Sequence, residues 1–230
     1  MVIAGLQNLS LVDYPGCLAS TVFLQGCNFK CPYCFNPDLV KKNPKKNIDI
    51  NHIFSFLEKR KGLLDGVVIS GGEPTLHEEL FPLCEKIREM GFFIKLDTNG
   101  SRPHVIKKLI QEGMIDYIAM DIKTDPAKYS PLIQKNSNPG QILSSIRIIM
   151  ASSLDYEFRT TCIKPLINDS ILERISMQIK DATLYALQQF QQTKVLHPAF
   201  FTGKERRFTD DELFHLKAIA KRWVKECIVR

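Results

Sequence analysis

Apolar and polar residues follow two alternating patterns along the chain, and together they predict repeated strand and helix units. Short β-branched runs, of which Val67-Val68-Ile69 is the clearest, lie between glycines and predict buried strands. Between such runs, apolar residues recur at intervals of three and four, as at Ile50, Ile53 and Leu57 behind a capping Asp49. We expect strands at residues 21–26, 66–70, 92–98, 116–122, 156–163 and 182–190.

The order of these elements predicts the fold class. Strand followed by helix, repeated to the end of the chain, indicates right-handed parallel βα units. Eight units of roughly thirty residues each would need more chain than the N-terminal segment leaves available. We therefore expect an α/β fold, a partial (β/α)6 barrel of the TIM type whose open side admits a macromolecular substrate. Residues 1–20 should add an edge strand and a turn, and residues 209–226 a last helix with a Thr209–Glu212 capping box.

Two of the predicted strands carry polar residues along one face. By the two-residue period of a strand, Lys95, Asp97 and Asn99 share a side, and Asp121 and Lys123 share a side in the next strand. A parallel sheet is normally apolar on both faces. These polar faces therefore predict a lined cavity rather than a covered core.

Three cysteines lie four and three residues apart in the segment 27–36, directly after a predicted strand. They are Cys27, Cys31 and Cys34. Thiolates are the natural ligands of iron–sulfur clusters and of zinc. A structural zinc site or an electron-transfer cluster normally takes four protein ligands, and no fourth Cys or His follows closely. The spacing thus predicts a metal centre with one open position, and the alternative is a zinc site completed by a distant ligand such as Cys17 or His52.

Composition narrows the class of protein. At 230 residues, with 44% hydrophobic and 24% charged residues, the chain is expected to form one globular domain over residues 1–230. Its seven cysteines are an odd number, which argues against a complete disulfide framework and favours a reduced compartment. The sequence shows no long apolar run and no signal-peptide pattern, so we expect a soluble, cytoplasmic protein without a membrane partner.

The net charge of +6 is modest and spread along the chain, and it does not predict a nucleic-acid partner. The densest run of positive charge surrounds Asn43 and Pro44 and predicts a solvated loop. Its members are Lys41, Lys42, Lys45 and Lys46.

The spacing C-x3-C-x2-C, with Tyr33 directly before the last cysteine, resembles the pattern of the radical S-adenosylmethionine enzymes. In that family three cysteines hold three irons of a 4Fe–4S cluster, and the fourth iron binds the amino and carboxylate groups of S-adenosylmethionine. One electron from the cluster then cleaves the sulfonium to methionine and a 5'-deoxyadenosyl radical. The resemblance implies that Cys27, Cys31 and Cys34 bind the cluster and that Tyr33 lies near the cofactor.

Later segments match further motifs of the same family. Gly71-Gly72-Glu73-Pro74 resembles its GGEP motif, and Asp97-Thr98-Asn99 with the following glycine resembles its D-T-N-G. Asp121 begins a D-I-K segment, and Arg159 lies in a Phe-Arg-Thr-Thr segment that the family places close to the cofactor. The resemblance implies that these residues contact S-adenosylmethionine. The alternatives are a simple βα turn at the glycines and a buried ion pair of Arg159 with Glu157 or Asp121.

The N-terminal segment Ser10-Leu11-Val12-Asp13-Tyr14-Pro15-Gly16 resembles the entry of the activating enzymes of glycyl-radical proteins. The similarity is greatest to the activating proteins of anaerobic ribonucleoside-triphosphate reductase, with pyruvate formate-lyase activating enzyme more distant. It implies a glycyl-radical enzyme as partner and a reduced flavodoxin or ferredoxin as electron donor. Phe35 departs from the pattern, since many relatives carry His there.

Two other readings stay open at this point. One is a radical S-adenosylmethionine enzyme that acts on a small molecule or on another glycyl-radical protein, because one fold hosts many substrates. The other is a non-enzymatic iron–sulfur carrier or a zinc-stabilised binding module.

Overall fold

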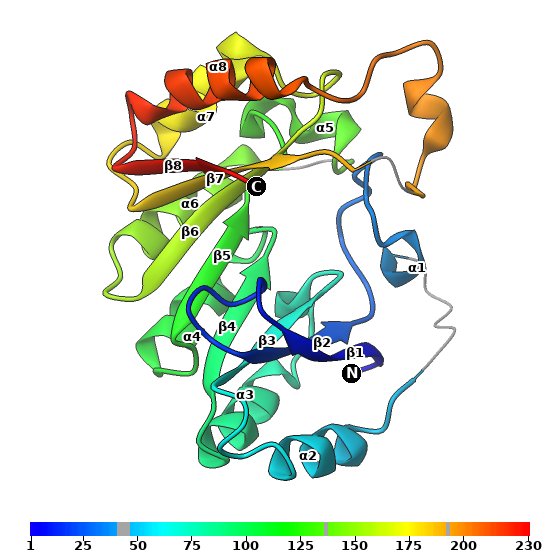
Figure 1. Ribbon diagram of the computed structural model, residues 1–230, viewed down its shortest axis with the longest axis vertical. Coiled ribbons are helices and arrows are strands. Elements are labelled where there is room, and N and C mark those ends of the chain that lie inside the picture. The colour runs from blue at the N-terminus through cyan, green and yellow to red at the C-terminus, as the bar shows by residue number, and fades with distance from the viewer. Residues whose placement is uncertain (41–46, 136–137, 192–193) are drawn as a thin grey trace.

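The fold is built on one curved sheet of eight strands (Figure 1). The structure is a computed structural model, and it describes residues 1–40, 47–135, 138–191 and 194–230. The strands lie in the order of the sequence: β1 (Ile3–Ser10), β2 (Ala19–Leu24), β3 (Gly66–Gly71), β4 (Phe93–Thr98), β5 (Tyr117–Asp121), β6 (Asp155–Cys162), β7 (Leu184–Gln189) and β8 (Glu226–Val229). β1 is antiparallel to β2, and all neighbouring pairs from β2 to β8 are parallel.

Helices follow each of the strands β2 to β7, and the longer ones cover the convex side of the sheet (Figure 1). They are α1 (Pro37–Val40), α2 (Ile50–Glu58), α3 (Leu80–Glu89), α4 (Pro103–Gln111), α5 (Tyr129–Leu132), α6 (Pro139–Met150), α7 (Asp169–Gln178) and α8 (Asp210–Lys221). Within the described residues, β1 and β8 form the two edges of the sheet and do not pair with each other. The predicted partial (β/α)6 barrel is confirmed. The lysine run at Lys41, Lys42, Lys45 and Lys46 lies outside the described residues.

Side-chain caps explain where several of the helices begin. Asp49 accepts a hydrogen bond from Asn51 N at the start of α2, and Asn138 accepts one from Gly140 N at the start of α6. Thr209 and Glu212 form the predicted capping box of α8. These caps join residues that are two or three positions apart, so they can be recognised in the sequence without any tertiary contact.

The six predicted strands are all present, with the first one shifted to Ala19–Leu24. The predicted N-terminal edge strand is β1. The expectation of one helix over residues 209–226 is wrong, because α8 ends at Lys221 and Glu226–Val229 forms β8. Cys227 accordingly lies in a strand, not near a helix end.

The turn between α8 and β8 is fixed by backbone hydrogen bonds to the segment before β7. Asp181 N donates to Trp223 O at 2.8 Å, and Lys225 N donates to Ala182 O at 2.9 Å. These contacts join residues some forty positions apart, so they are tertiary and leave no local signal in the sequence. They stop the helix and direct the last residues alongside β7.

Alternate residues of the strands face the helices or the inside of the barrel. Ile69, Ile94 and Leu96 belong to the main apolar core and are fully buried. Lys95 and Glu157 are equally buried, each 1% exposed, but belong to the polar side of their strands. The predicted polar face is therefore enclosed within the curve of the sheet, where its charges must find partners.

Candidate functional site

A cavity of about 530 Å³ lies at the carboxyl ends of the parallel strands, closed on one side by the cysteine segment. This is the end of a β/α barrel at which active sites are built. The segment contributes Cys27, Cys31, Tyr33 and Cys34 to the lining. The strand ends contribute Ser70, Gly71, Gly72, Asp97, Thr98, Asn99, Asp121 and Arg159. The structure therefore brings together, in one cavity, residues that are spread over more than 130 positions of the sequence.

Backbone hydrogen bonds at three points hold the cysteine segment over the cavity. Gly26 N donates to Leu39 O at 2.7 Å, Lys30 N donates to Ile133 O at 2.8 Å, and His197 N donates to Pro32 O at 3.0 Å. The predicted loop around the cysteines is thus anchored on both sides of the barrel opening. His197 takes part through its backbone and caps the short 3₁₀ helix Pro198–Phe201.

Phe35, the departure from the family pattern, packs against the end of the barrel. Its ring stacks on Phe190 with centroids 5.4 Å apart and contacts Tyr33 edge-on at 6.5 Å. Phe190 in turn stacks on Phe201. The side chain after the last cysteine therefore fixes the segment to the region just after β7.

The glycine pair at the end of β3 lets two stretches of backbone meet. A Cβ atom on Gly72 would lie 1.8 Å from Gly26 O, and one on Gly71 would lie 2.3 Å from Leu24 O. Gly71 also has a φ of +122°, a backbone conformation that residues with a Cβ atom rarely adopt. Only glycines at these two positions allow the end of β3 to pack this closely against the backbone at the start of the cysteine segment.

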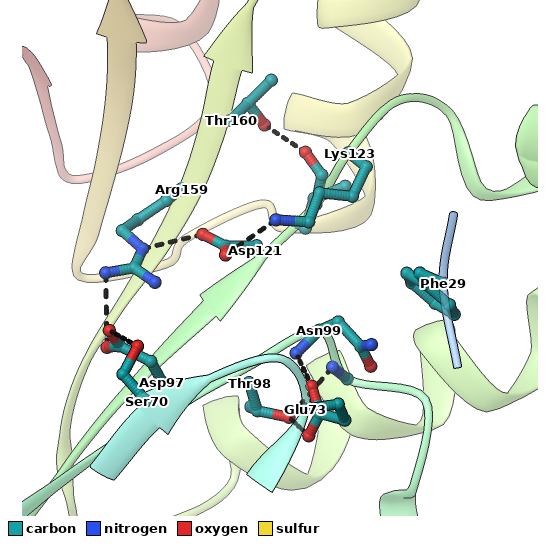
Figure 2. A network of polar contacts seen from close by, with 12 residues as sticks. Phe29, Ser70, Glu73, Asp97, Thr98, Asn99, Asp121, Lys123, Arg159 and Thr160 are labelled. Atoms are coloured by element: carbon teal, nitrogen blue, oxygen red, sulfur yellow. Dashed lines mark hydrogen bonds and ion pairs between the residues drawn. The ribbon is translucent and has the colours of Figure 1, made fainter. Parts of the chain in front are cut away.

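Glu73 lies behind the cavity rather than in its lining. Its carboxylate is fully buried and accepts hydrogen bonds from Thr98 Oγ1 at 2.8 Å and from Asn99 N at 2.6 Å, as well as from Thr75 (Figure 2). Burial raises the pKa of this carboxyl despite those bonds. The side chain therefore joins the turn after β3 to the end of β4, and neither it nor Pro74 lines the cavity.

An ion-pair network covers the strand wall of the cavity (Figure 2). Arg159 Nε donates to Asp121 Oδ1 at 2.8 Å, and Arg159 Nη1 lies 3.3 Å from Asp97 Oδ1. Lys123 Nζ donates to Asp121 Oδ2 at 2.8 Å, and Lys95 pairs with Asp97. Burial alone would raise the pKa of Asp121, but the charges of Arg159 and Lys123 outweigh it and hold that pKa below its usual value.

Burial favours the protonated form of the three thiols. Burial raises the pKa of Cys27 to about 11 and that of Cys31 to about 12, and burial also raises the pKa of Cys34. No three Cys, His, Asp or Glu side chains of the described residues converge on one metal ion. A cluster differs from a single metal ion, because it attaches each thiolate to a different iron. In either case the ligand is the thiolate, so binding must remove the thiol protons.

The cavity fits a cluster with an open iron better than a closed zinc site. Within the described part of the chain, its lining includes three cysteines and no histidine. Cys17 and His52, the distant ligands of the zinc alternative, are not part of it. The hydroxyl of Tyr33 is buried with no hydrogen-bond partner among the described residues, which is consistent with a ligand still to be bound beside it.

Several lining residues were not predicted to contact a cofactor or a metal. They include Asp13, Ser70, Lys123, Thr161, Gln188, Gln189 and Arg230. The sequence signal for Lys123 is the polar strand face that it shares with Asp121. The sequence holds no such signal for Arg230, because the position of Arg230 depends on β8.

Comparison with known proteins identifies the family. The model of the radical SAM superfamily matches residues 21–176, which is more than half of the chain. The chain belongs to the radical SAM superfamily. Over its whole length it is 33% identical to a protein of Methanocaldococcus jannaschii described as a glycyl-radical enzyme activating enzyme, and it covers 95% of that protein. Over 53% of its length it is 31% identical to the pyruvate formate-lyase-activating enzyme of Clostridium pasteurianum, and it covers 52% of that enzyme.

Solved structures agree on the fold. SuiB of Streptococcus suis, in a crystal structure bound to S-adenosylmethionine, matches 91% of this chain with a TM-score of 0.66, and 51% of its own chain is covered. An archaeal TYW1 matches 90% of this chain with a TM-score of 0.56, and 72% of its own chain is covered. The identities are 13% and 16%, so these two structures support the fold only.

Family membership removes one of the readings left open by the sequence, the non-enzymatic one. The chain is an enzyme of the radical SAM superfamily, in the branch of glycyl-radical enzyme activating enzymes, and its cofactors are a 4Fe–4S cluster and S-adenosylmethionine. The reading as a non-enzymatic carrier or zinc module is set aside. None of the helices in the described residues is long and apolar enough to cross a bilayer.

Proposed function

We propose that this enzyme generates a glycyl radical on an anaerobic ribonucleoside-triphosphate reductase. In this proposal, Cys27, Cys31 and Cys34 bind three irons of the cluster, and residues 1–230 act as one domain. One observation carries the proposal: three thiols from a single segment line a cavity that offers no fourth Cys or His among the described residues. One iron is thereby left for a ligand that is not part of the chain.

The strand wall of the cavity suits S-adenosylmethionine, which combines a carboxylate with an ammonium and a sulfonium group. The carboxylates of Asp97 and Asp121 lie beside the cations of Lys123 and Arg159, so the wall offers both signs of charge within one network. Tyr33, Thr98 and Asn99 also line the cavity. We propose that these residues, with the backbone of the Gly71-Gly72-Glu73-Pro74 turn, orient the cofactor.

When held by Cys27, Cys31, Cys34 and the strand wall, the two cofactors would supply a one-electron cleavage of S-adenosylmethionine, with the electron from an external donor, that releases methionine and can remove the Cα hydrogen atom of a glycine. The hydrogen atom would end on 5'-deoxyadenosine, and the radical would be left on the partner's glycine. The chain's own part is to hold the target glycine at the cavity and to keep water away from it. The burial of Cys31 and Lys95 favours that exclusion, and Cys27, Cys34, Asp97 and Arg159 are half-buried beside them.

The mouth of the cavity favours a protein substrate. Asp13 is part of the lining, and the two residues before it are strongly exposed, Leu11 at 69% and Val12 at 81%. Exposed apolar side chains beside an active site indicate contact with a macromolecule. A glycine-bearing loop of a partner enzyme would be a macromolecular substrate of this kind.

A second candidate partner is pyruvate formate-lyase, because the chain is also similar to pyruvate formate-lyase-activating enzymes. The two candidates share the cofactors and differ only in the protein that carries the glycine. We propose a flavodoxin or ferredoxin as the source of the electron in either case, and the cytoplasm as the location.

The decisive experiment combines two readouts on the anaerobically reconstituted enzyme. Formation of 5'-deoxyadenosine from S-adenosylmethionine under reduction reports the cleavage, and the glycyl-radical EPR signal on each purified partner reports the target. We expect both products with the reductase. Cleavage without a radical on the reductase would contradict the partner, and an intact cluster that gives no cleavage would contradict the proposed chemistry.

A further inference from the structure

The side chain of Asn99, directly after β4, lies beside Cys27. Asn99 Nδ2 lies 3.8 Å from Cys27 Sγ and 3.0 Å from Asn28 Oδ1. A side-chain amide nitrogen carries two protons, so it can donate one to each. Phe29 N donates to the same sulfur at 3.4 Å.

The orientation of the Asn99 amide is fixed by a group that can only donate. Ser101 N donates to Asn99 Oδ1 at 3.0 Å, and a backbone N–H has no acceptor function. The oxygen of the amide must therefore face Ser101, and the NH₂ group must face Cys27. Flipping the amide would place two donors against each other.

Asn28 and Ser101 complete a small ring around this amide. Asn28 Nδ2 donates to Ser101 Oγ at 2.8 Å, so that Asn28 presents its oxygen to Asn99. Asn99 and Ser101 are 5% and 4% exposed, and Glu73 holds the backbone N–H of Asn99 at 2.6 Å (Figure 2). The ring joins the residue that follows the first cysteine to the end of β4.

We propose that the Asn28–Asn99–Ser101 ring holds the Asn99 amide as a hydrogen-bond donor to the Cys27 thiolate and thereby raises the reduction potential of the cluster. The inference rests on the proposed function, because it takes Cys27 as a cluster ligand. Reduction adds one electron, and hence one negative charge, to the cluster. A donor on a ligand sulfur stabilises the more negative state, so the reduced cluster is favoured.

The structure makes Asn99 a positioning residue toward Cys27, in addition to the S-adenosylmethionine contact expected for it. The two roles are separable, since the potential can be measured without S-adenosylmethionine. The electron in the experiment comes from dithionite, and each cluster takes up one.

The test is an EPR-monitored redox titration of the reconstituted full-length enzyme, for the parent, Asn99→Leu and Asn99→Asp. Leu removes the amide at nearly constant size, and Asp keeps the acceptor for Ser101 N while presenting no NH₂ group to Cys27. At a fixed applied potential we expect the ratio of reduced to oxidised cluster to fall about fivefold in Asn99→Leu, a shift of about 40 mV to more negative potential for a one-electron couple. The shift in Asn99→Asp should be at least as large, because its carboxylate also adds a negative charge beside the cluster.

Asn51→Leu is the matched control. It makes the same substitution at an exposed asparagine outside the cavity lining, so its potential should equal that of the parent. An unchanged or less negative potential in an Asn99 variant that retains its cluster would overturn the inference. So would loss of the cluster from both Asn99 variants with native circular dichroism, because removing one hydrogen bond does not predict loss of a three-thiolate site.

Iron and sulfide analysis of Cys27→Ala, Cys31→Ala and Cys34→Ala separates this inference from the proposed function. If those variants retain a full cluster, the ligand assignment in the proposed function fails. If they lose it and the Asn99 variants keep the parent potential, only the role of Asn99 fails.

Discussion

Arg159 holds together two carboxylates that would otherwise repel each other. Its guanidinium contacts Asp121 at 2.8 Å and Asp97 at 3.3 Å. The three side chains are 13%, 23% and 17% exposed, so solvent screens these pairs weakly. Without the arginine, two half-buried carboxylates would keep Lys95 and Lys123 as their cationic partners among the described residues, and Asp97 would keep a hydrogen bond from Ser70.

We expect Arg159→Met to lower the free energy of unfolding by about 3 kcal/mol at pH 7, because it leaves half-buried carboxylates incompletely paired. Urea unfolding followed by circular dichroism measures the change. Arg88→Met is the matched control. It removes an arginine from an exposed pair with Asp116 and should cost less than about 1 kcal/mol. Equal losses in the two variants would contradict the role of the network.

The same network gives the stability a defined pH dependence. Burial would raise the pKa of Asp97 and Asp121, but their cationic neighbours outweigh it and keep both pKa values below those of the unfolded chain. Their contribution is therefore complete above the unfolded pKa of about 3.9 and is lost as the pH falls through the lower, folded values. The difference between the parent and Arg159→Met should be largest near pH 7 and should shrink below about pH 4.

Sequence reasoning found this residue but could not assign its partners. Asp121 and Glu157 were both candidates for an ion pair with Arg159. The pair with Asp121 is confirmed at 2.8 Å. Glu157 also pairs with Arg159, at 4.0 Å, but lies closer to Arg230, at 2.8 Å. The choice depends on strand register and on a strand that the sequence did not reveal.

At the scale of elements, the turn after β3 and the start of the cysteine segment are built as one unit. Gly72 N donates to Leu24 O at 2.9 Å, and Glu73 N donates to Gly26 O at 2.8 Å. These two backbone segments are so close that a side chain at Gly72 would overlap the Gly26 carbonyl. The position of the cysteines therefore depends on a residue that carries no reactive group.

We expect Gly72→Ala to lower the free energy of unfolding by about 3 kcal/mol and to reduce the iron bound after reconstitution, because the overlap displaces the cysteine segment. Gly5→Ala is the control, since a Cβ there would make ordinary contacts, 3.4 Å at the closest, with the Phe23 ring. Its effect should stay within about 0.5 kcal/mol. Full iron binding by Gly72→Ala would contradict the dependence of the segment on this turn.

The last strand neutralises a charge inside the barrel. Arg230, directly after β8, contacts both carboxylate oxygens of Glu157, at 3.2 Å and 2.8 Å. Glu157 is 1% exposed, so the arginine is its main counter-charge, with Arg159 at 4.0 Å. The end of the chain thus stabilises a residue in the middle of β6.

We expect Arg230→Met to cost about 2 kcal/mol, less than a fully buried pair because Arg230 is 36% exposed. Adding Glu157→Gln should recover most of that loss, since the amide carries no unpaired charge. Thermal or urea unfolding of the two single variants and the double variant completes the cycle. Additive losses would show that the two residues do not stabilise each other.

Local patterns predicted the longer elements, and tertiary contacts account for the strand that was missed. The strand and helix periods predicted β2 to β7, and capping residues predicted the starts of α2 and α8. β8 is short, and Trp223 and Cys227 extend the helical spacing of α8 past its true end. Only the pairing with β7 shows that these residues leave the helix.

At the scale of the whole molecule, the sheet is an arc whose two ends do not meet in the described residues (Figure 1). The cysteine segment lies over the carboxyl ends of the parallel strands, and the exposed Leu11 and Val12 lie beside Asp13 at the cavity. This arrangement leaves an approach for a protein segment, which a closed barrel would restrict.

Linear motifs predicted the composition of the cavity better than its internal contacts. Cys27, Cys31, Tyr33 and Cys34 were recognisable by spacing, and the structure places them in one lining. Glu73 was also recognisable, yet its carboxylate supports Asn99 from behind the cavity. A motif specifies which residues lie near each other, while the direction of a side chain depends on the packing around it.

The most direct test is the EPR spectrum of the reduced, reconstituted enzyme before and after addition of S-adenosylmethionine, together with its iron content. We expect about four irons per chain, a changed spectrum on addition, and loss of the signal in Cys27→Ala, Cys31→Ala and Cys34→Ala but not in Cys17→Ala. A spectrum that S-adenosylmethionine leaves unchanged, or a full cluster in the three cysteine variants, would contradict a three-thiolate cluster with an open iron.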